Sequence, residues 1–261
     1  MRHNRTKARL KANQPTFCLW TRTVDVGLME FMGYQGWDCF VFDGEHGVID
    51  AAQAEHLIRA AELRDVTPLV RVSNKQPDTI LRYLDVGAQG IVAPRVDNGP
   101  QAAAVVKAIK YPPLGMRGLA GVRAATFGHE TNLAAHVEQS NLETLTIVQI
   151  ESAEAVQNID AILATAHVDV VFIGPADLSL SLGVPGDTGN PAVKEAINHV
   201  FQHARAADVA VGTLFKDAAG ARVGVETGYL FIAITLEAFT GVAARRFLSM
   251  RADIEGPSTV Y

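Results

Sequence analysis

Short apolar runs alternate with longer amphipathic segments along almost the whole chain. The apolar runs are rich in Val, Ile, Leu and Phe without a polar face, which is typical of parallel strands covered on both sides. We predict eight such strands, at residues 16–21, 37–42, 67–72, 89–93, 145–150, 168–173, 209–214 and 229–234.

The segments between these runs carry apolar residues at helical spacing. Gly36, Gly87 and Gly228 stand where helices are expected to end in a left-handed cap. We predict helices at residues 26–35, 51–64, 78–86, 100–109, 153–164, 192–206, 218–226 and 237–250.

Eight strand–helix units in 261 residues predict an α/β fold, a closed (β/α)8 TIM barrel. A doubly wound open sheet is the competing arrangement, but no GxGxxG follows the first strand. We expect one barrel domain over residues 1–261, with an N-terminal arm (1–14), a long inserted segment (111–143) and a tail (253–261). An insertion of that length in a compact domain usually serves function or an interface.

Composition narrows the function classes. The net charge is −5, so no overall basic field favours nucleic acid or anionic lipid. No signal peptide and no membrane-spanning apolar stretch is found in the sequence, and a cytoplasmic location is expected. Cys18 and Cys39 lack metal-site or CxxC spacing and are interpreted as buried, reduced thiols.

Polar residues collect at the predicted C-terminal strand ends, where TIM barrels carry their chemistry. The second strand ends in Asp43, Gly44, Glu45 and His46. The third ends in Arg71, which alternation places on the face of Leu69. Arg71 therefore either points inward at the barrel mouth or is shielded by helices. The alternative to a functional role is a barrel-mouth ion pair with Asp43 or Glu151.

Two carboxylates follow neighbouring strands, Glu151 after the fifth and Asp177 after the sixth. Carboxylates without His or Cys beside them suit a hard divalent ion, Mg²⁺ or Mn²⁺, with Co²⁺ as a further candidate. The alternative is local: Glu151 precedes the helix cap Ser152, and Asp177 caps a short turn. Because the two stand at adjacent strand ends, we predict the metal site.

His46 is the imidazole of this cluster, and a satisfied loop histidine is its alternative interpretation. Asp85 lies near the end of the third predicted helix, where the helix dipole disfavours a carboxylate, so a partner is expected. His46 is a candidate partner, and the pairing would fix the imidazole tautomer.

Together these residues resemble the HpcH/HpaI aldolases, the metal-dependent 4-hydroxy-2-oxo-acid aldolases. The resemblance extends from about Leu10 to Arg245. Its matching stretches are residues 42–46 (FDGEH), 70–71 (VR), 84–87 (LDVG), 111–118 (YPPLGMRG), 149–151 (QIE) and 172–179 (FIGPADLS).

The resemblance implies a barrel of the phosphoenolpyruvate/pyruvate type that cleaves a 4-hydroxy-2-oxo acid to pyruvate, or a close 2-oxo acid, and an aldehyde. Glu151 and Asp177 would hold the metal, and Arg71 would face the 2-oxo oxygen and the enolate. His46, oriented by Asp85, would be the acid/base on the 4-hydroxyl.

Further substrate contacts and the assembly are also implied. The family suggests a homo-oligomer, a trimer or hexamer, in which the last helix is exchanged between subunits. The inserted segment would then approach a neighbour's site. The residues implied to bind substrate are Asp43, Gln149, Gly174, Ala176 and Leu214.

The chain departs from the family pattern at the barrel mouth. Arg22, Arg95, Thr235 and Glu237 stand where other residue types are usual. They leave the pyruvate half of the site intact and concern the aldehyde half. We therefore take Arg22 and Arg95, with Arg123 of the inserted segment, as candidates for selecting an acidic or polyhydroxylated acceptor.

Three other functions remain open. A Schiff-base aldolase needs a lysine at the barrel mouth, and Lys216 is the one lysine near a strand's C-terminal end. A citrate-lyase-like acyl-CoA lyase shares the metal and the enolate, but no clear basic groove for the CoA phosphates is seen. A non-catalytic barrel needs no convergence of Arg71, Glu151 and Asp177.

Overall fold

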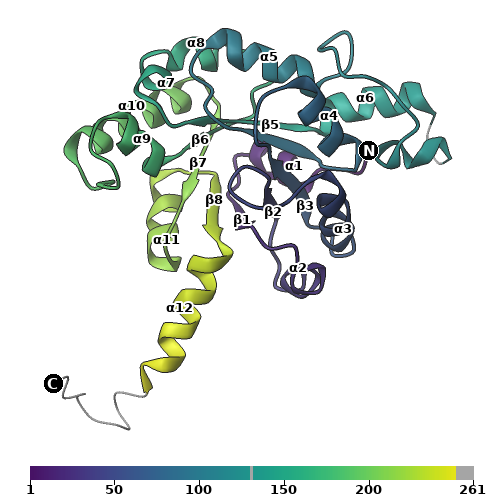
Figure 1. Cartoon of the computed structure of the whole chain (residues 1–261). Helices are drawn as coiled ribbons and strands as arrows, with labels where there is room; N and C mark the ends of the chain where they lie inside the picture. The colour runs from purple at the N-terminus through teal and green to yellow at the C-terminus, as the bar shows by residue number, and fades with distance from the viewer. Residues whose placement is uncertain (130–131, 251–261) are drawn as a thin grey trace.

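The computed structural model describes residues 1–129 and 132–250. Eight parallel strands close into a barrel in the order of the sequence, which confirms the predicted fold and excludes the open sheet (Figure 1). The strands are β1 (Thr16–Thr21), β2 (Cys39–Asp43), β3 (Thr67–Arg71), β4 (Gly90–Ala93), β5 (Leu145–Ile150), β6 (Val170–Ile173), β7 (Ala210–Leu214) and β8 (Phe231–Thr235).

Helix α1 (Arg5–Lys11) precedes the first strand, and the other helices lie in the segments that follow the strands. They are α2 (Val26–Gly33), α3 (Ala51–Glu62), α4 (Pro77–Asp85), α5 (Gly99–Ile109), η1 (Arg123–Gly128), α6 (Leu133–Glu143), α7 (Ala153–Gln157), α8 (Ile159–Leu163), α9 (Pro175–Ser181), α10 (Pro191–Ala206), α11 (Ala218–Thr227) and α12 (Leu236–Leu248). Gly36, Gly87 and Gly228 have positive φ, as expected of residues that end helices.

One predicted helix, residues 153–164, is two short helices in the structure. The break falls at Asn158, whose backbone leaves the helical region and whose side-chain amide donates to the carbonyl of Asp97 at 3.0 Å. A polar side chain that bonds to a distant backbone competes with continued helix formation. The apolar spacing alone does not show this competition.

Alternation along the strands divides the core into two layers. One face of each strand packs against the helices, and the other fills the barrel interior. The interior cluster includes Leu10 of α1, which lies across the N-terminal end of the barrel, and otherwise consists of strand residues: Cys18, Trp20, Cys39, Val41, Leu69, Val92, Leu145, Ile147, Val170, Phe172, Ala210, Phe231 and Ala233.

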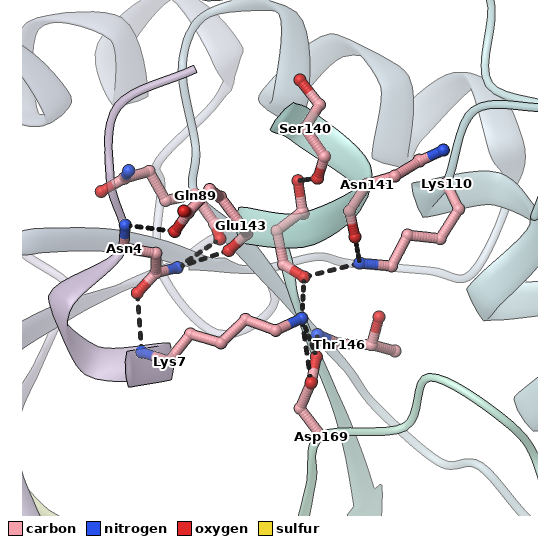
Figure 2. A network of polar contacts seen from close by, with 10 residues as sticks. Asn4, Lys7, Gln89, Lys110, Ser140, Asn141, Glu143, Thr146 and Asp169 are labelled. Atoms are coloured by element: carbon pink, nitrogen blue, oxygen red, sulfur yellow. Dashed lines mark hydrogen bonds and ion pairs between the residues drawn. The ribbon is translucent and has the colours of Figure 1, made fainter. Parts of the chain in front are cut away.

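The N-terminal segment contains a docked helix where we expected an arm. Asn4 caps α1, and the ammonium of Lys7 lies beneath the barrel (Figure 2). Lys7 Nζ donates to Thr144 O at 2.8 Å and pairs with Asp169 at 2.9 Å. Lys110 Nζ donates to the same carbonyl at 2.7 Å. Lys7, one of the basic residues of this segment, therefore helps to close one end of the barrel.

The two cysteines are buried, as predicted, but the prediction of reduced thiols is wrong. The structure joins Cys18 and Cys39 in a disulfide, with their Cα atoms 4.7 Å apart. In the register of β1 and β2 these two residues are direct partners, so both side chains enter the barrel interior at one level. Strand register is not visible in the spacing of two cysteines along the sequence.

The inserted segment and the last helix differ in how they meet the barrel. The insertion contains η1 and α6 within the described residues, beside a turn that begins at Tyr111. Helix α12 projects away from the barrel body instead of lying along it (Figure 1). The predicted tail, 253–261, lies outside the described residues.

Candidate active site

Three polar side chains continue the interior face of their strands beyond the apolar core. Asp43 follows Val41, Arg71 follows Leu69 and Gln149 follows Ile147 at alternate positions, and these apolar residues belong to the interior cluster. All three polar residues are at least nine-tenths buried. Alternation therefore directs them into the barrel mouth at the C-terminal strand ends, which for Arg71 is the inward of the two orientations considered from the sequence.

Arg71 is fixed by two carboxylates. Its Nε and Nη2 bond to the two oxygens of Asp43 at 2.9 and 2.5 Å, and its Nη1 lies 3.0 Å from Glu45. The guanidinium carbon lies 5.0 Å from the centre of the Trp20 ring. The ion pair with Asp43 that we considered from the sequence is thus present, and it holds a cation in a defined orientation at the mouth.

The turn after β2 is shaped around Asp43. One carboxylate oxygen accepts from the backbone N–H groups of Glu45 and His46, both at 3.1 Å. Burial acts to raise the pKa of Asp43, but Arg71 and these N–H groups outweigh it and hold the pKa below its usual range. Gly44 is required here, because a Cβ would lie 2.9 Å from the carbonyl of Arg71.

Glu151 is the most perturbed carboxylate of the site. Burial raises the pKa of Glu151 to about 7; the N–H of Arg95 opposes this effect, whereas the charges of Asp177 and Glu45 add to it. Its two oxygens accept from Arg95 N at 2.8 Å and from Gln149 Nε2 at 3.1 Å. The charge of Arg71 also acts to lower the pKa of Glu151, but burial and the neighbouring acids outweigh it.

Asp177 lies in the first turn of α9, which begins directly after β6. Its charge acts on both Glu151 and Glu45, so the three carboxylates share one electrostatic environment. Gly174, the N-cap of α9, has no side chain to cap the helix, and a Cβ there would lie 2.8 Å from Glu151 Oε2. The chain therefore leaves space beside the carboxylate pair.

The structure agrees in part with the alternative roles of Glu151 and Asp177 at helix caps. Ser152 does cap α7, with its hydroxyl accepting from Ala155 N at 3.0 Å, so Glu151 does precede a helix cap. Asp177 is inside α9 instead of capping a turn. Neither observation accounts for the burial of Glu151 or for the Gln149 Oε1 atom, which is buried without a hydrogen-bond partner in the described part of the chain.

Three other predicted site residues, His46, Ala176 and Leu214, are exposed at the barrel mouth. His46 is exposed in the turn after β2, and its backbone N–H is tied to Asp43. Ala176 is exposed in the first turn of α9. Leu214 ends β7 with 38% of its surface exposed, which leaves an apolar side chain at the mouth.

The structure does not bring Asp85 or Arg123 to this cluster within one chain. Asp85 ends α4, which runs back to the N-terminal end of the barrel, and it accepts from Arg117 Nη2 at 2.9 Å. Arg123 is paired with Glu62 at the end of α3 and donates to the carbonyl of Val86 at 2.9 Å. The prediction of both residues relied on family likeness and helix position, which do not fix which end of the barrel they occupy.

Arg22 and Arg95, which were predicted to select the acceptor, differ in their contacts. Arg22 pairs with Glu237 at 3.1 Å, both being about half exposed. Arg22 and Glu237, two of the residues that depart from the family pattern, therefore form an ion pair with each other. Arg95 follows β4, and its side chain is exposed.

Two residues of this region were missed from the sequence. Trp20 is buried in the barrel interior, 5.0 Å ring to ring from Phe172 and beneath Arg71. Lys75, in the loop after β3, reaches the carbonyl of Arg95. Alternation along β1 could have identified Trp20, whereas nothing in the spacing identifies a loop lysine.

Fold and site together define a parallel barrel with an oriented arginine and buried carboxylates at its C-terminal strand ends. Residues 16–244 match the model of the HpcH/HpaI aldolase/citrate lyase family. The chain belongs to this family. The resemblance stated from the sequence is therefore confirmed.

Named relatives support the family assignment. The chain is 38% identical to a hydroxypyruvate/pyruvate aldolase of Sagittula stellata, over 93% of this chain and 96% of that protein. It is 36% identical to a 2-keto-3-deoxy-L-rhamnonate aldolase of Klebsiella pneumoniae, over 92% and 90%. The crystal structure of a HpcH/HpaI aldolase/citrate lyase family protein from Burkholderia cenocepacia has a TM-score of 0.89 and 34% identity, over 95% and 98%. Aldolases are carbon–carbon lyases, as predicted for this enzyme.

Proposed function

We propose that this chain is a divalent-metal-dependent aldolase that reversibly cleaves a 4-hydroxy-2-oxo acid to pyruvate, or a close 2-oxo acid, and an aldehyde. The observation that carries the proposal is the buried Glu151 beside Asp177, with Arg71 as the nearest oriented cation. The activities of the named relatives lie within this reaction class.

The residues present fit a hard divalent ion such as Mg²⁺, Mn²⁺ or Co²⁺. Glu151 and Asp177 would hold it through carboxylate oxygens, and Gln149 Oε1 is a buried acceptor in need of a partner. In the described ranges no group of three or more His, Cys, Asp and Glu could hold a metal. Two protein carboxylates with substrate and water completing the shell are typical of Mg²⁺ sites. When bound, the ion supplies a positive charge that stabilises the enolate.

Side chains and backbone groups of the protein bind the substrate and move the proton. Arg71, preorganised by Asp43 and Glu45, presents its charge to the 2-oxo oxygen, where negative charge develops as the C3–C4 bond breaks. Gln149 orients the oxo acid from the barrel interior. His46, exposed at the mouth, takes the proton from the 4-hydroxyl. The backbone N–H groups of Ala176 and Asp177 receive the substrate carboxylate.

An Asp85–His46 pair requires a second copy of the chain, because the two residues lie at opposite ends of one barrel. We therefore include a homo-oligomer, a trimer or hexamer, in the proposal. Helix α12 projects from the barrel, and an apolar cavity of about 550 Å³ beside it is lined by Trp37, Phe215 and Phe239, among others. Exchange of α12 between subunits would cover this surface. Light scattering tests this part, since a monomer contradicts it.

Steady-state assays test the reaction. Protein incubated with pyruvate and an aldehyde should form a 4-hydroxy-2-oxo acid, lose activity in excess EDTA and regain it with Mn²⁺. Borohydride in the presence of pyruvate should trap no adduct, since Lys216 is exposed and a Schiff-base lysine needs a desolvated site. EDTA-resistant activity with a trapped lysine would overturn the metal-based proposal. Turnover restricted to an acyl-CoA would assign a lyase of the citrate-lyase type instead.

We also propose a cytoplasmic location, which cell fractionation tests. Among the described residues no helix has the length and apolar character to cross a membrane. Disulfides are rare in the reducing cytoplasm. The Cys18–Cys39 disulfide is therefore the observation that argues against this location, and recovery of the protein outside the cytoplasmic fraction would overturn the proposal.

A further inference from the structure

Two imidazoles lie side by side on the solvent-facing side of α10. His199 and His203 are four residues apart, about one helical turn, so they share a face of the helix. The centres of their rings are 4.1 Å apart, with 41° between the ring planes. His199 is exposed, and 36% of the His203 side chain is exposed. Both rings are therefore open to an ion from solution.

A carboxylate of the neighbouring helix fixes one of these rings. Helix α8 packs against α10, and its Asp160 Oδ1 lies 2.6 Å from His203 Nδ1. An ionised carboxylate only accepts, so Nδ1 donates, and in the neutral ring the lone pair is on Nε2. Histidines that bind metals usually donate their second ring N–H to such a carboxylate. Asp160 thus gives His203 the tautomer of a metal ligand.

The other ring nitrogens have no partner within the described part of the chain. Neither nitrogen of His199, nor Nε2 of His203, forms a hydrogen bond over residues 1–129 and 132–250. Neither side chain belongs to the apolar core, which α10 meets through its buried residues such as Val200 and Ala204. Packing therefore does not account for the placement of the two rings together.

The chemistry of the pair differs from that of the barrel mouth. Two histidines four residues apart on a helix are the arrangement with which helices bind Zn²⁺. Imidazole nitrogen suits Zn²⁺, Cu²⁺ and Ni²⁺, whereas carboxylate oxygen suits Mg²⁺ and Mn²⁺. The described residues include no group of three or more His, Cys, Asp and Glu that could hold a metal, so the pair supplies two ligands and water the others.

We propose that His199 and His203 bind a divalent ion of the zinc class, Zn²⁺, Cu²⁺ or Ni²⁺, and that Asp160 orients His203 for this role. The site is separate from the carboxylate pair at the barrel mouth and does not depend on the proposed aldolase function. Because the ligands are on α10 and the orienting carboxylate is on α8, the ion stabilises the packing of these two helices.

Zinc affinity tests the site, and the measurement uses a parent protein that carries Glu151→Gln and Asp177→Asn. These changes prevent Zn²⁺ from binding to the carboxylate pair of the mouth. Competition against a chromophoric zinc chelator should show one Zn²⁺ per chain that is bound more tightly than any further ion.

Four substitutions in this parent assign the ion to its ligands. Asp160→Asn should weaken Zn²⁺ binding about 10-fold, the lower end of the effect of removing a carboxylate behind a histidine ligand. His199→Gln and His203→Gln should each weaken it further, because each removes a ligand. His56→Gln removes an exposed imidazole on α3 and is the matched control, which should leave the affinity unchanged.

Two further measurements distinguish a metal ligand from a surface histidine. Electron paramagnetic resonance of the Cu²⁺-loaded parent should show coupling to two imidazole nitrogens, and His199→Gln should reduce this to one. Addition of Zn²⁺ should raise the urea midpoint of the parent, since the ion binds the folded helix more tightly than the unfolded chain. The rise should be smaller in His203→Gln.

Contrary outcomes are equally specific. If His199→Gln and His203→Gln bind Zn²⁺ as tightly as the parent does, the site is wrong, whatever the aldolase assays show. If Asp160→Asn alone leaves the affinity unchanged, the orienting role of this carboxylate is wrong.

Discussion

Both ends of this barrel bury charged side chains, but the two ends differ in the partners that those side chains have. At the N-terminal end, Lys7 and Lys110 share the carbonyl of Thr144, and Asp169 neutralises Lys7 (Figure 2). At the C-terminal end, Glu151 lies among other acids and Gln149 Oε1 has no partner in the described part of the chain. At the N-terminal end Lys7 has a carboxylate partner, although burial and the charge of Lys7 lower the pKa of Lys110 to about 7. At the C-terminal end Glu151 accepts from two N–H donors but forms no ion pair among the described residues.

The difference is consistent with the function proposed for the C-terminal end and with a structural role of the N-terminal end. A buried charge without a partner costs several kcal/mol, so a protein keeps one where a ligand completes it. A buried charge with partners closes the barrel and orders the chain around it. If this interpretation is right, changes at the C-terminal end should reduce activity and spare stability, and changes at the N-terminal end should do the opposite.

The largest effect is expected from Glu151→Gln and Asp177→Asn. Each removes a proposed metal ligand and should lower kcat/KM by about 10³-fold or more, because the enolate loses its main positive charge. Urea unfolding of the metal-free variants should show equal or higher stability, since each change removes a carboxylate from a like-charged group. A clear loss of stability with normal turnover would contradict the contrast between the two ends.

Arg71→Lys should affect both properties, because Arg71 is the one site cation that the chain also satisfies. Lysine cannot bond to both oxygens of Asp43 and also reach Glu45. We expect kcat/KM to fall by about 10²-fold and stability by roughly 2 kcal/mol, since Asp43 stays buried. The exposed pair offers a control: Arg59→Lys on α3 should change neither.

Asp169→Asn should affect stability alone. It leaves the buried Lys7 ammonium without its carboxylate, which costs about 3 kcal/mol when one partner of a buried pair is removed. Lys7→Met with Asp169→Asn should recover part of the loss, because the charge is removed as well. Turnover under native conditions should stay within about twofold; a large decrease in kcat would show that the two ends are coupled.

The sequence predicted the barrel because continuous apolar strands and helical spacing repeat eight times. It predicted Arg71 and Glu151 because alternate strand positions share a face, and Asp177 because it follows the neighbouring strand. It could not place Asp85 or Arg123, since these depend on how loops and helix ends fold back. Pairings between distant segments, such as Cys18 with Cys39 and Arg22 with Glu237, depend on register and remain invisible in one chain's pattern.

The smallest expected effect is a pH dependence at the N-terminal end. His136 is fully buried, and burial, the amino group of Met1 and Arg117 lower its pKa to about 4. Its Nε2 lies 3.2 Å from the Ser140 hydroxyl, and the structure favours the neutral ring.

Protonation then favours the unfolded chain, in which histidine has its ordinary pKa of about 6.5. Below that value the unfolded state binds more protons than the folded state, so stability falls as the pH drops from about 6.5 toward 4. Between pH 7 and 5 we expect a loss of about 2 kcal/mol from this residue. Urea titrations should show that loss shrink in His136→Gln and persist in His56→Gln, whose imidazole is exposed on α3. An unchanged slope in His136→Gln would mean that this end of the barrel already accommodates a charged imidazole, and the contrast between the two ends would then hold only for its lysines.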